Sequence, residues 1–263
     1  MSRPDSPIRS RRRPRSAALN MAIWRVQTPL TSPRVRGTIE QDGRVTEVYL
    51  EAGKRRVFAC ATQWPGWCRP GRGEEAALAA LAAAAPRYAE VCARAGFAFD
   101  PVEAVAGFEV LERVTGSATT DFGALDVAPA LDGEPVAAQE AERLATLIQT
   151  AWDLFEQTAA VAPPELRKGP RGGGRDRDQI VAHVRETEVL HARMLGLRER
   201  PFPPEDVAAL ERVQAGILAE IRACSARPPG ELARSRRPAR FVARRTAWHA
   251  LDHAWEILDR QEP

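Results

Sequence analysis

Residues 239–260, ARFVARRTAWHALDHAWEILDR, form the most informative stretch of this 263-residue chain. The apolar residues recur at three- to four-residue intervals, which predicts a helix with a buried side. His249 and His253 are four residues apart, so the helix places both imidazoles on one face, with Cβ atoms about 5–6 Å apart. Thr246 and Glu256 continue this polar line, and apolar residues flank it. Such a line is typical of a helix that contributes to a ligand site inside a helical bundle.

A second segment, residues 176–196, is also predicted to be a helix and holds a third histidine. One face of it collects Ile180, His183, Thr187, Leu190 and Met194. His183 is therefore expected to point inward, whereas His191 lies about 80° from this face and is expected at the surface or rim. The chain has only four histidines, so three inward imidazoles on two helices predict a metal site on His183, His249 and His253.

Two further segments complete a four-helix pattern over residues 135–263. One helix is expected over about 137–160, and another opens near Pro203 and runs to about 226. Pro238 opens the last helix, and prolines at helix starts are the usual punctuation. Four helices of this length predict an up-and-down four-helix bundle.

Three neutral imidazoles suit zinc, nickel, iron or copper, and they leave coordination positions open for a reactive site. Glu256 is a candidate fourth ligand or an acceptor for an imidazole N–H, and Asp252 and Glu186 are further candidates to orient the imidazoles. Glu256 and Glu186 are also the candidate catalytic proton acceptors. The alternative is that the histidines are simply buried and hydrogen-bonded. A His-x-x-x-His pair such as His249 and His253 arises easily by chance. The third histidine, His183, makes a metal site the favoured interpretation.

The same residues resemble the DinB/YfiT-like superfamily of four-helix metalloenzymes. That family has one histidine in its second helix, matched here by His183 in Ile180–Val184, and a His-x-x-x-His in its last helix, matched by His249 and His253. The resemblance covers about residues 137–263. It implies a divalent metal (zinc, nickel or iron) on the three histidines. It also implies a thiol-dependent S-transferase or isomerase that uses mycothiol, bacillithiol or glutathione.

A metal at this position would lower the pKa of a bound thiol or water, which gives a thiolate or hydroxide near neutral pH. Thiol-dependent group transfer or isomerisation of a small molecule is therefore the leading expectation for this chain, and hydrolysis is the next. The Arg/Gly-rich loop 167–177 (Arg167, Lys168, Arg171, Arg175 and Arg177) either grips an anionic substrate or thiol or, as is commoner for such loops, is simply solvated.

Residues 36–115 predict a small α+β domain. Strands are expected over 37–40, 45–51 and 56–61, with glycine-bearing turns between them. Pro65–Cys68 is expected to end the sheet. An Ala/Leu-rich helix follows from Glu74 to about Ala95, and Pro86 is a site where this helix kinks or splits. One more strand is expected at Phe108–Glu112, and residues 116–134 have the composition of a linker.

Residues 36–96 resemble HicB-like domains, the α+β modules of certain antitoxins. The resemblance rests on Pro65-Gly66, Gly71 and the run Glu74–Leu78 after the strands. It implies toxin or RNA partners, but no DNA-binding motif follows, so only the fold is carried over. The alternative function is thus a non-catalytic interaction or regulatory protein, with a HicB-like module that binds a protein partner and a helical scaffold.

The net charge of +3 comes from the N-terminal arm, residues 1–35. Its first 16 residues contain six arginines and one acid, which leaves −2 for the remaining chain. A near-neutral body gives no electrostatic case for nucleic acid as a partner. The arm is predicted to be disordered because of its prolines and serines; a basic tail, a targeting peptide and a start at Met21 stay open.

No secretory h-region and no apolar run of about 18 residues occur, so no membrane association is expected. The cysteines are scattered without a Cys-x-x-Cys pair, at Cys60, Cys68, Cys92 and Cys224. This spacing favours reduced thiols and a cytoplasmic location. A homodimer stays open.

Overall fold

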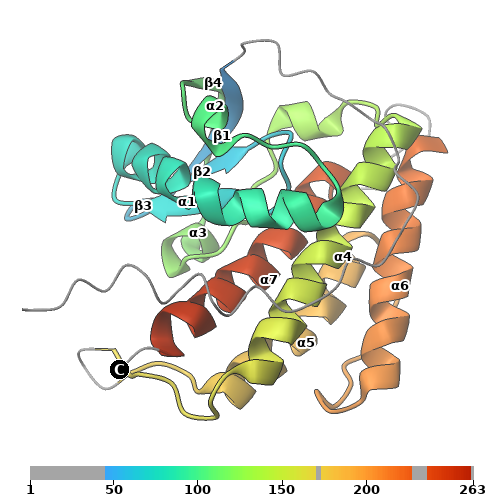
Figure 1. Cartoon of the computed structure of the whole chain (residues 1–263). Coiled ribbons are helices and arrows are strands. Elements are labelled where there is room, and N and C mark those ends of the chain that lie inside the picture. The colour runs from blue at the N-terminus through green and yellow to red at the C-terminus, as the bar shows by residue number, and fades with distance from the viewer. Residues whose placement is uncertain (1–44, 170–172, 227–235, 262–263) are drawn as a thin grey trace, which may run out of the picture. The chain divides into compact units, whose positions relative to one another are not determined.

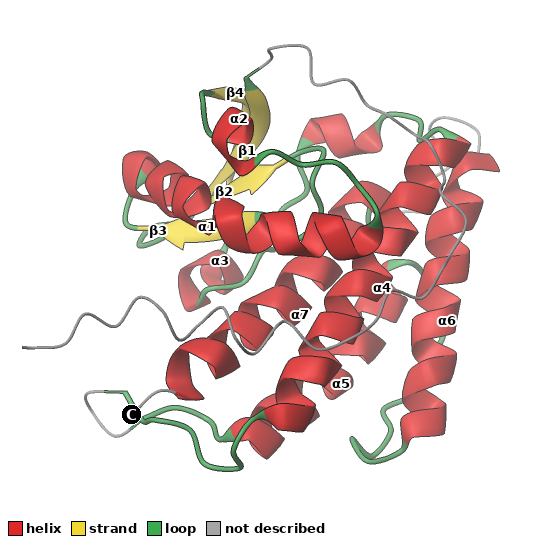
Figure 2. Ribbon diagram, in the orientation of Figure 1, coloured by secondary structure: helices red, strands yellow, loops and turns green. Residues whose placement is uncertain are grey.

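The computed structural model describes residues 45–169, 173–226 and 236–261 (Figure 1). Within these ranges, a small four-stranded sheet precedes a mostly helical region, and the described elements include seven α-helices (Figure 2). The predicted order, α+β and then all-α, is confirmed at this level. The predicted arm and the strand at 37–40 lie outside the described residues. The described residues all belong to one compact unit. The domain boundaries expected at residues 115 and 135 stay a prediction.

The sheet is mixed. Its strand order is β3-β2-β1-β4, formed by β1 (Thr46–Ala52), β2 (Val57–Ala61), β3 (Cys68–Gly71) and β4 (Phe108–Thr115). β2 pairs antiparallel with both β1 and β3, whereas β4 pairs parallel with β1. The parallel β4 is reached through a helical crossover, as parallel pairing requires.

The structure corrects the prediction that the sheet ends at Pro65–Cys68. Gly66 takes a φ of 94° in a turn there, and Cys68–Gly71 returns as β3 along β2. This strand is hard to recognise in the sequence because it contains Pro70 and Gly71, residues that are typical of turns. β3 is an edge strand, where a proline is tolerated because one side of the strand needs no ladder hydrogen bonds.

Helix α1 (Glu74–Ala95) packs against β2 and β3. It runs through Pro86 as one element, so the proline does not split it. The backbone of the helix approaches β3 so closely that a Cβ on Gly71 would lie 2.2 Å from the Ala77 nitrogen. Gly71 is therefore required by close contact with the helix.

A buried cluster joins the sheet to the helical region. It contains Tyr49, Phe58, Cys60, Cys68, Leu125 and Trp248. Trp248 belongs to the last helix, and its ring meets Phe58 edge-on at 5.5 Å. Leu125 comes from the predicted linker, which also holds α3 (Ala118–Phe122) and the 3₁₀ turn η1 (Ala130–Gly133); the short α2 (Pro101–Ala104) precedes β4.

Four long helices follow, close to their predicted bounds: α4 (Ala138–Val161), α5 (Arg177–Met194), α6 (Val207–Ala223, continued by the 3₁₀ turn η2, Cys224–Ala226) and α7 (Ala239–Gln261). Helix α4 packs mainly against α6 and α7, and α5 packs against the same two helices. In an up-and-down bundle each helix neighbours the next, so the predicted order is wrong for α4 and α5. The long connection over residues 162–176 allows α5 to follow α4 in the chain without packing beside it. Across the described ranges, no helix has both the length and the apolar content needed to cross a membrane.

Helix α7 is buried on both sides. It packs against α4 and α5 on one side, and on the other side Trp248 meets Phe58 of β2 and Asp252 pairs with Arg69 of β3. Arg244 forms a fully buried bidentate ion pair with Asp132, at 2.7 and 3.0 Å, on the sheet side. With the sheet side occupied by Trp248 and Arg244, the line of His249 and His253 faces the other helices. The fold thus fixes the direction of both imidazoles.

Candidate metal centre

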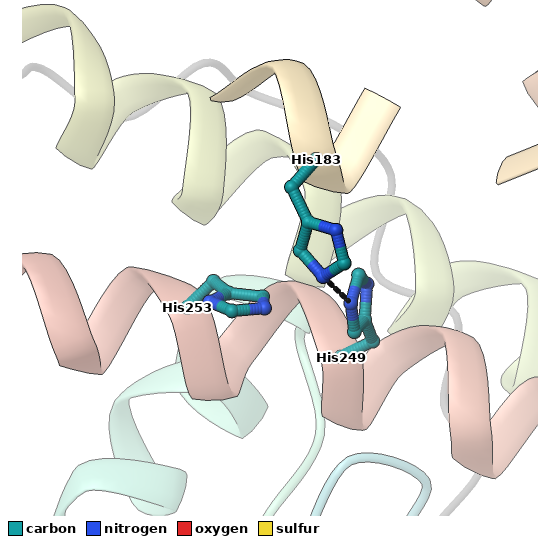
Figure 3. A group of neighbouring side chains, drawn as sticks. All are labelled: His183, His249 and His253. Carbon is teal, nitrogen blue, oxygen red and sulfur yellow. Dashed lines mark hydrogen bonds between the residues drawn. The ribbon is translucent and has the colours of Figure 1, made fainter. Parts of the chain in front are cut away.

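The three predicted histidines converge in the structure (Figure 3). His183 projects from α5 toward His249 and His253 on α7, and one candidate ligand atom from each residue lies within 4.8 Å of the others. The Nε2 atoms of His183 and His249 are 3.2 Å apart. The three ring-centroid distances are 5.1, 5.1 and 4.8 Å. The group could therefore hold a metal ion.

Burial keeps two of these imidazoles neutral. His249 is only 8% exposed; burial, followed by the charges of neighbouring imidazoles and of Arg245, holds its pKa well below the ordinary value. Burial also lowers the pKa of His183 to about 4, and the charges of His253 and Arg175 add to this effect. Neutral imidazole is the form that binds a metal. Both rings therefore carry no charge at neutral pH.

Glu256 orients His253. Its Oε2 lies 2.8 Å from His253 Nδ1, and its Oε1 accepts a 2.6 Å hydrogen bond from Arg260. These two partners, His253 first, lower the pKa of Glu256, although burial opposes them. A carboxylate on Nδ1 leaves Nε2 of His253 free for a metal, the common arrangement behind a metal-binding histidine.

Sequence reasoning placed His191 at the surface, and the structure corrects this. The side chain is fully buried, and its ring centroid lies 5.7 Å from that of His249. Leu190, which was expected on the inward face, is instead 45% exposed. The sequence analysis locates the inward face of α5 from its apolar residues alone. The buried face of the helix in fact also includes the acidic residue Glu188.

Glu188 is a buried polar residue near the three histidines that the sequence analysis does not single out. Its Oε2 lies 3.2 Å from His191 Nδ1, and its Oε1 accepts a 3.0 Å hydrogen bond from Trp152 Nε1 on α4. The side chains of Glu188 and His191 are both buried. The available signal was the Glu-x-x-His spacing, which places both residues on one helix face.

The remaining candidates make no hydrogen bond to the three histidines within the described ranges. Glu186 is exposed, and no hydrogen bond to the trio is present among the described residues. Asp252 pairs with Arg69 on β3 at 2.7 Å. In the loop, Lys168 pairs with Asp176 and Arg177 with Asp178; Arg171 lies outside the described residues. A proton-acceptor role for Glu256 or Glu186 stays a prediction.

Comparisons of the chain with models of protein families, with curated proteins and with solved structures gave no match.

The donor set itself fits a transition metal. Two nitrogens that share one zinc at 2.0–2.1 Å in tetrahedral geometry lie roughly 3.3 Å apart. The Nε2 atoms of His183 and His249 are already separated by 3.2 Å. The Nδ1 atom of His249 is buried and lacks a hydrogen-bond partner within the described ranges. Three imidazoles without a carboxylate ligand favour zinc, nickel or iron over magnesium or calcium.

Proposed function

We propose that this protein is a divalent-metal-dependent enzyme that acts on a small molecule. The observation that carries the proposal is the convergence of His183, His249 and His253, with their candidate ligand atoms within 4.8 Å. Three protein ligands are typical of catalytic rather than structural zinc sites, because positions remain for the reacting groups. When bound, zinc, nickel or iron would act as a Lewis acid and lower the pKa of a thiol or water.

The protein's own residues would hold and shield the ion. Glu256 accepts the Nδ1 proton of His253, while Arg260 holds the second oxygen of Glu256. His183 and His253 are partly exposed, so a small molecule can reach the centre from their side. Arg175 is exposed, and its positive charge contributes to the lowered pKa of His183. Among the loop cations it is the one we assign to an anionic group of the substrate or thiol.

The reaction class rests on the resemblance of residues 137–263 to DinB/YfiT-like proteins. It favours a thiol-dependent S-transferase or isomerase with mycothiol, bacillithiol or glutathione, and hydrolysis is the second choice. The test is consumption of each thiol in the presence of a panel of small electrophiles, with zinc-, nickel- and iron-loaded protein. We expect turnover with one thiol that is lost in His253→Ala and retained in Glu142→Gln, a distant surface variant. Turnover of water-labile esters or amides without any thiol would instead support hydrolysis.

A second candidate function is binding of a protein partner through the sheet region, which resembles HicB-like domains. The supporting observation is an open pocket of about 540 Å³ lined by Arg55, Arg56, Pro70, Gly71, Arg72, Asp121 and Phe122. Phe122 is 84% exposed, and within the described ranges the side chains of the three arginines have neither an ion pair nor a hydrogen bond. Unpaired arginines beside an exposed aromatic ring suit an acidic segment with an apolar side chain.

Binding of a glutamate–tyrosine copolymer, followed by fluorescence anisotropy, tests this second function. We expect binding to weaken in Phe122→Ala and in the triple arginine-to-alanine variant at Arg55, Arg56 and Arg72. The variant His249→Ala should bind as the wild type does. Equal binding by all variants would contradict a specific surface at this pocket.

A further inference from the structure

A buried hydrogen-bonded group lies directly behind His249. Trp152 on α4, together with Glu188 and His191 on α5, forms it, and Glu188 and His191 are completely buried. Two buried atoms beside it have no hydrogen-bond partner among the described residues, His191 Nε2 and His249 Nδ1. A buried polar atom without a partner is destabilising, because it has lost its hydrogen bonds to water without replacing them. The two rings that carry these atoms meet at 5.7 Å between centroids.

The chemistry of the group sets which ring nitrogens carry protons. The indole of Trp152 can only donate, so Glu188 Oε1 accepts. The second oxygen of the carboxylate accepts in turn from His191 Nδ1–H, which leaves His191 Nε2 with a lone pair. For His249 to present a lone pair on Nε2 to a metal, its proton must sit on Nδ1. The two unpartnered atoms are therefore one donor and one acceptor.

We propose that His191 is a positioning residue that accepts the Nδ1–H of His249 and so fixes the Nε2 atom of His249 toward the metal. This inference rests on the proposed metal-dependent function. Two imidazoles joined nitrogen to nitrogen have centroids about 5 Å apart, given a hydrogen bond of about 2.9 Å. The observed 5.7 Å is longer, so this hydrogen bond forms once one ring moves closer to the other.

The arrangement repeats the one on the other α7 histidine. His253 has a carboxylate directly on Nδ1, from Glu256, whereas His249 has a carboxylate one ring further away, from Glu188 through His191. Each ligand on α7 would then be held by its own carboxylate. Loss of such outer partners typically weakens metal binding roughly 10–100-fold.

The first test reads the proton directly in metal-free protein. Nitrogen-15 NMR of the histidine rings distinguishes a protonated from an unprotonated ring nitrogen. We expect His249 to carry its proton on Nδ1, with His183 Nε2–H donating across the 3.2 Å contact to His249 Nε2. A proton on His249 Nε2 instead would overturn the proposal. This measurement decides the inference even if the protein binds no metal, an outcome that would end the proposed function.

The second test measures zinc affinity by chelator competition in folded variants. His191→Phe keeps a ring but removes the acceptor, so we expect binding to weaken roughly 10–100-fold. His191→Gln supplies a carbonyl oxygen and should restore most of the affinity. The matched control is Leu190→Phe, at the exposed neighbouring position, which should bind as the wild type does. Affinity within about twofold of wild type in His191→Phe would overturn the proposal. Complete loss, as in His249→Ala, would also overturn it, because His191 would then be a ligand itself.

Discussion

His253 and Glu256 give the sharpest residue-scale prediction. Because Glu256 accepts from Nδ1 of His253 at 2.8 Å, Glu256→Gln weakens this contact and the orientation of the ring. We expect zinc affinity to fall roughly 10–100-fold. The matched control is Glu186→Gln on the exposed side of α5, for which no change is expected. Chelator competition measures both, and equal affinities in the two variants would contradict the role assigned to Glu256.

The lowered pKa of His183 makes the metal-free protein acid-sensitive. As pH falls through about 6.5, the unfolded chain takes up a proton on this ring, whereas the folded chain resists it down to a pKa of about 4. This contribution to stability is therefore complete above about pH 6.5 and is lost as pH falls toward 4. Urea unfolding at pH 7.5 and 5.0 should show a larger loss for wild type than for His183→Gln. An equal loss in both would contradict the prediction.

The histidine trio could be predicted because it depends on spacing within single helices. The four-residue interval between His249 and His253 fixes their relation once a helix forms. The inward face of α5 could not be predicted equally well, because it was located from apolar residues alone. The structure buries Glu188 there, and its partner Trp152 comes from another helix. Only tertiary packing reveals such a partner.

At the scale of elements, local sequence signals such as prolines at helix starts predicted the helices, but they did not predict the edge strand β3. Prolines near the starts of α6 and α7 marked those helices, and alternating residues marked β1 and β2. β3 contains Pro70 and Gly71, which local propensity assigns to a turn. The parallel pairing of β4 with β1 joins residues far apart in sequence, so no local pattern encodes it.

The contact between β3 and α1 predicts that Gly71→Ala is strongly destabilising. The added Cβ would lie 2.2 Å from the Ala77 nitrogen, and the neighbour is backbone that cannot rotate away. Overpacking of this kind costs about 1–3 kcal/mol or more. The matched control is Gly133→Ala, whose Cβ meets nothing within 4 Å. Thermal unfolding should show a clear loss only for Gly71→Ala; comparable melting temperatures would contradict the close approach.

At the scale of the whole molecule, α7 carries both the candidate metal centre and the contact with the sheet. Asp132 and Arg244 form the buried ion pair of that contact. Asp132→Ala leaves the guanidinium buried without its carboxylate, so we expect a loss of about 3–5 kcal/mol in unfolding free energy. Glu142→Ala breaks an exposed pair with Arg222 and should cost no more than about 1 kcal/mol. Similar losses in urea unfolding would show that the pair at Asp132 is not buried as described.

The most direct test of the metal centre is the metal content of untagged protein purified without chelators, measured by mass spectrometry. The double variant His249→Ala/His253→Ala is measured beside it. We expect near one equivalent of zinc, nickel or iron in the wild type and none in the variant. Absence of metal from both proteins, even after these ions are added, would contradict the proposed centre and leave the three histidines as packing residues of the helical region.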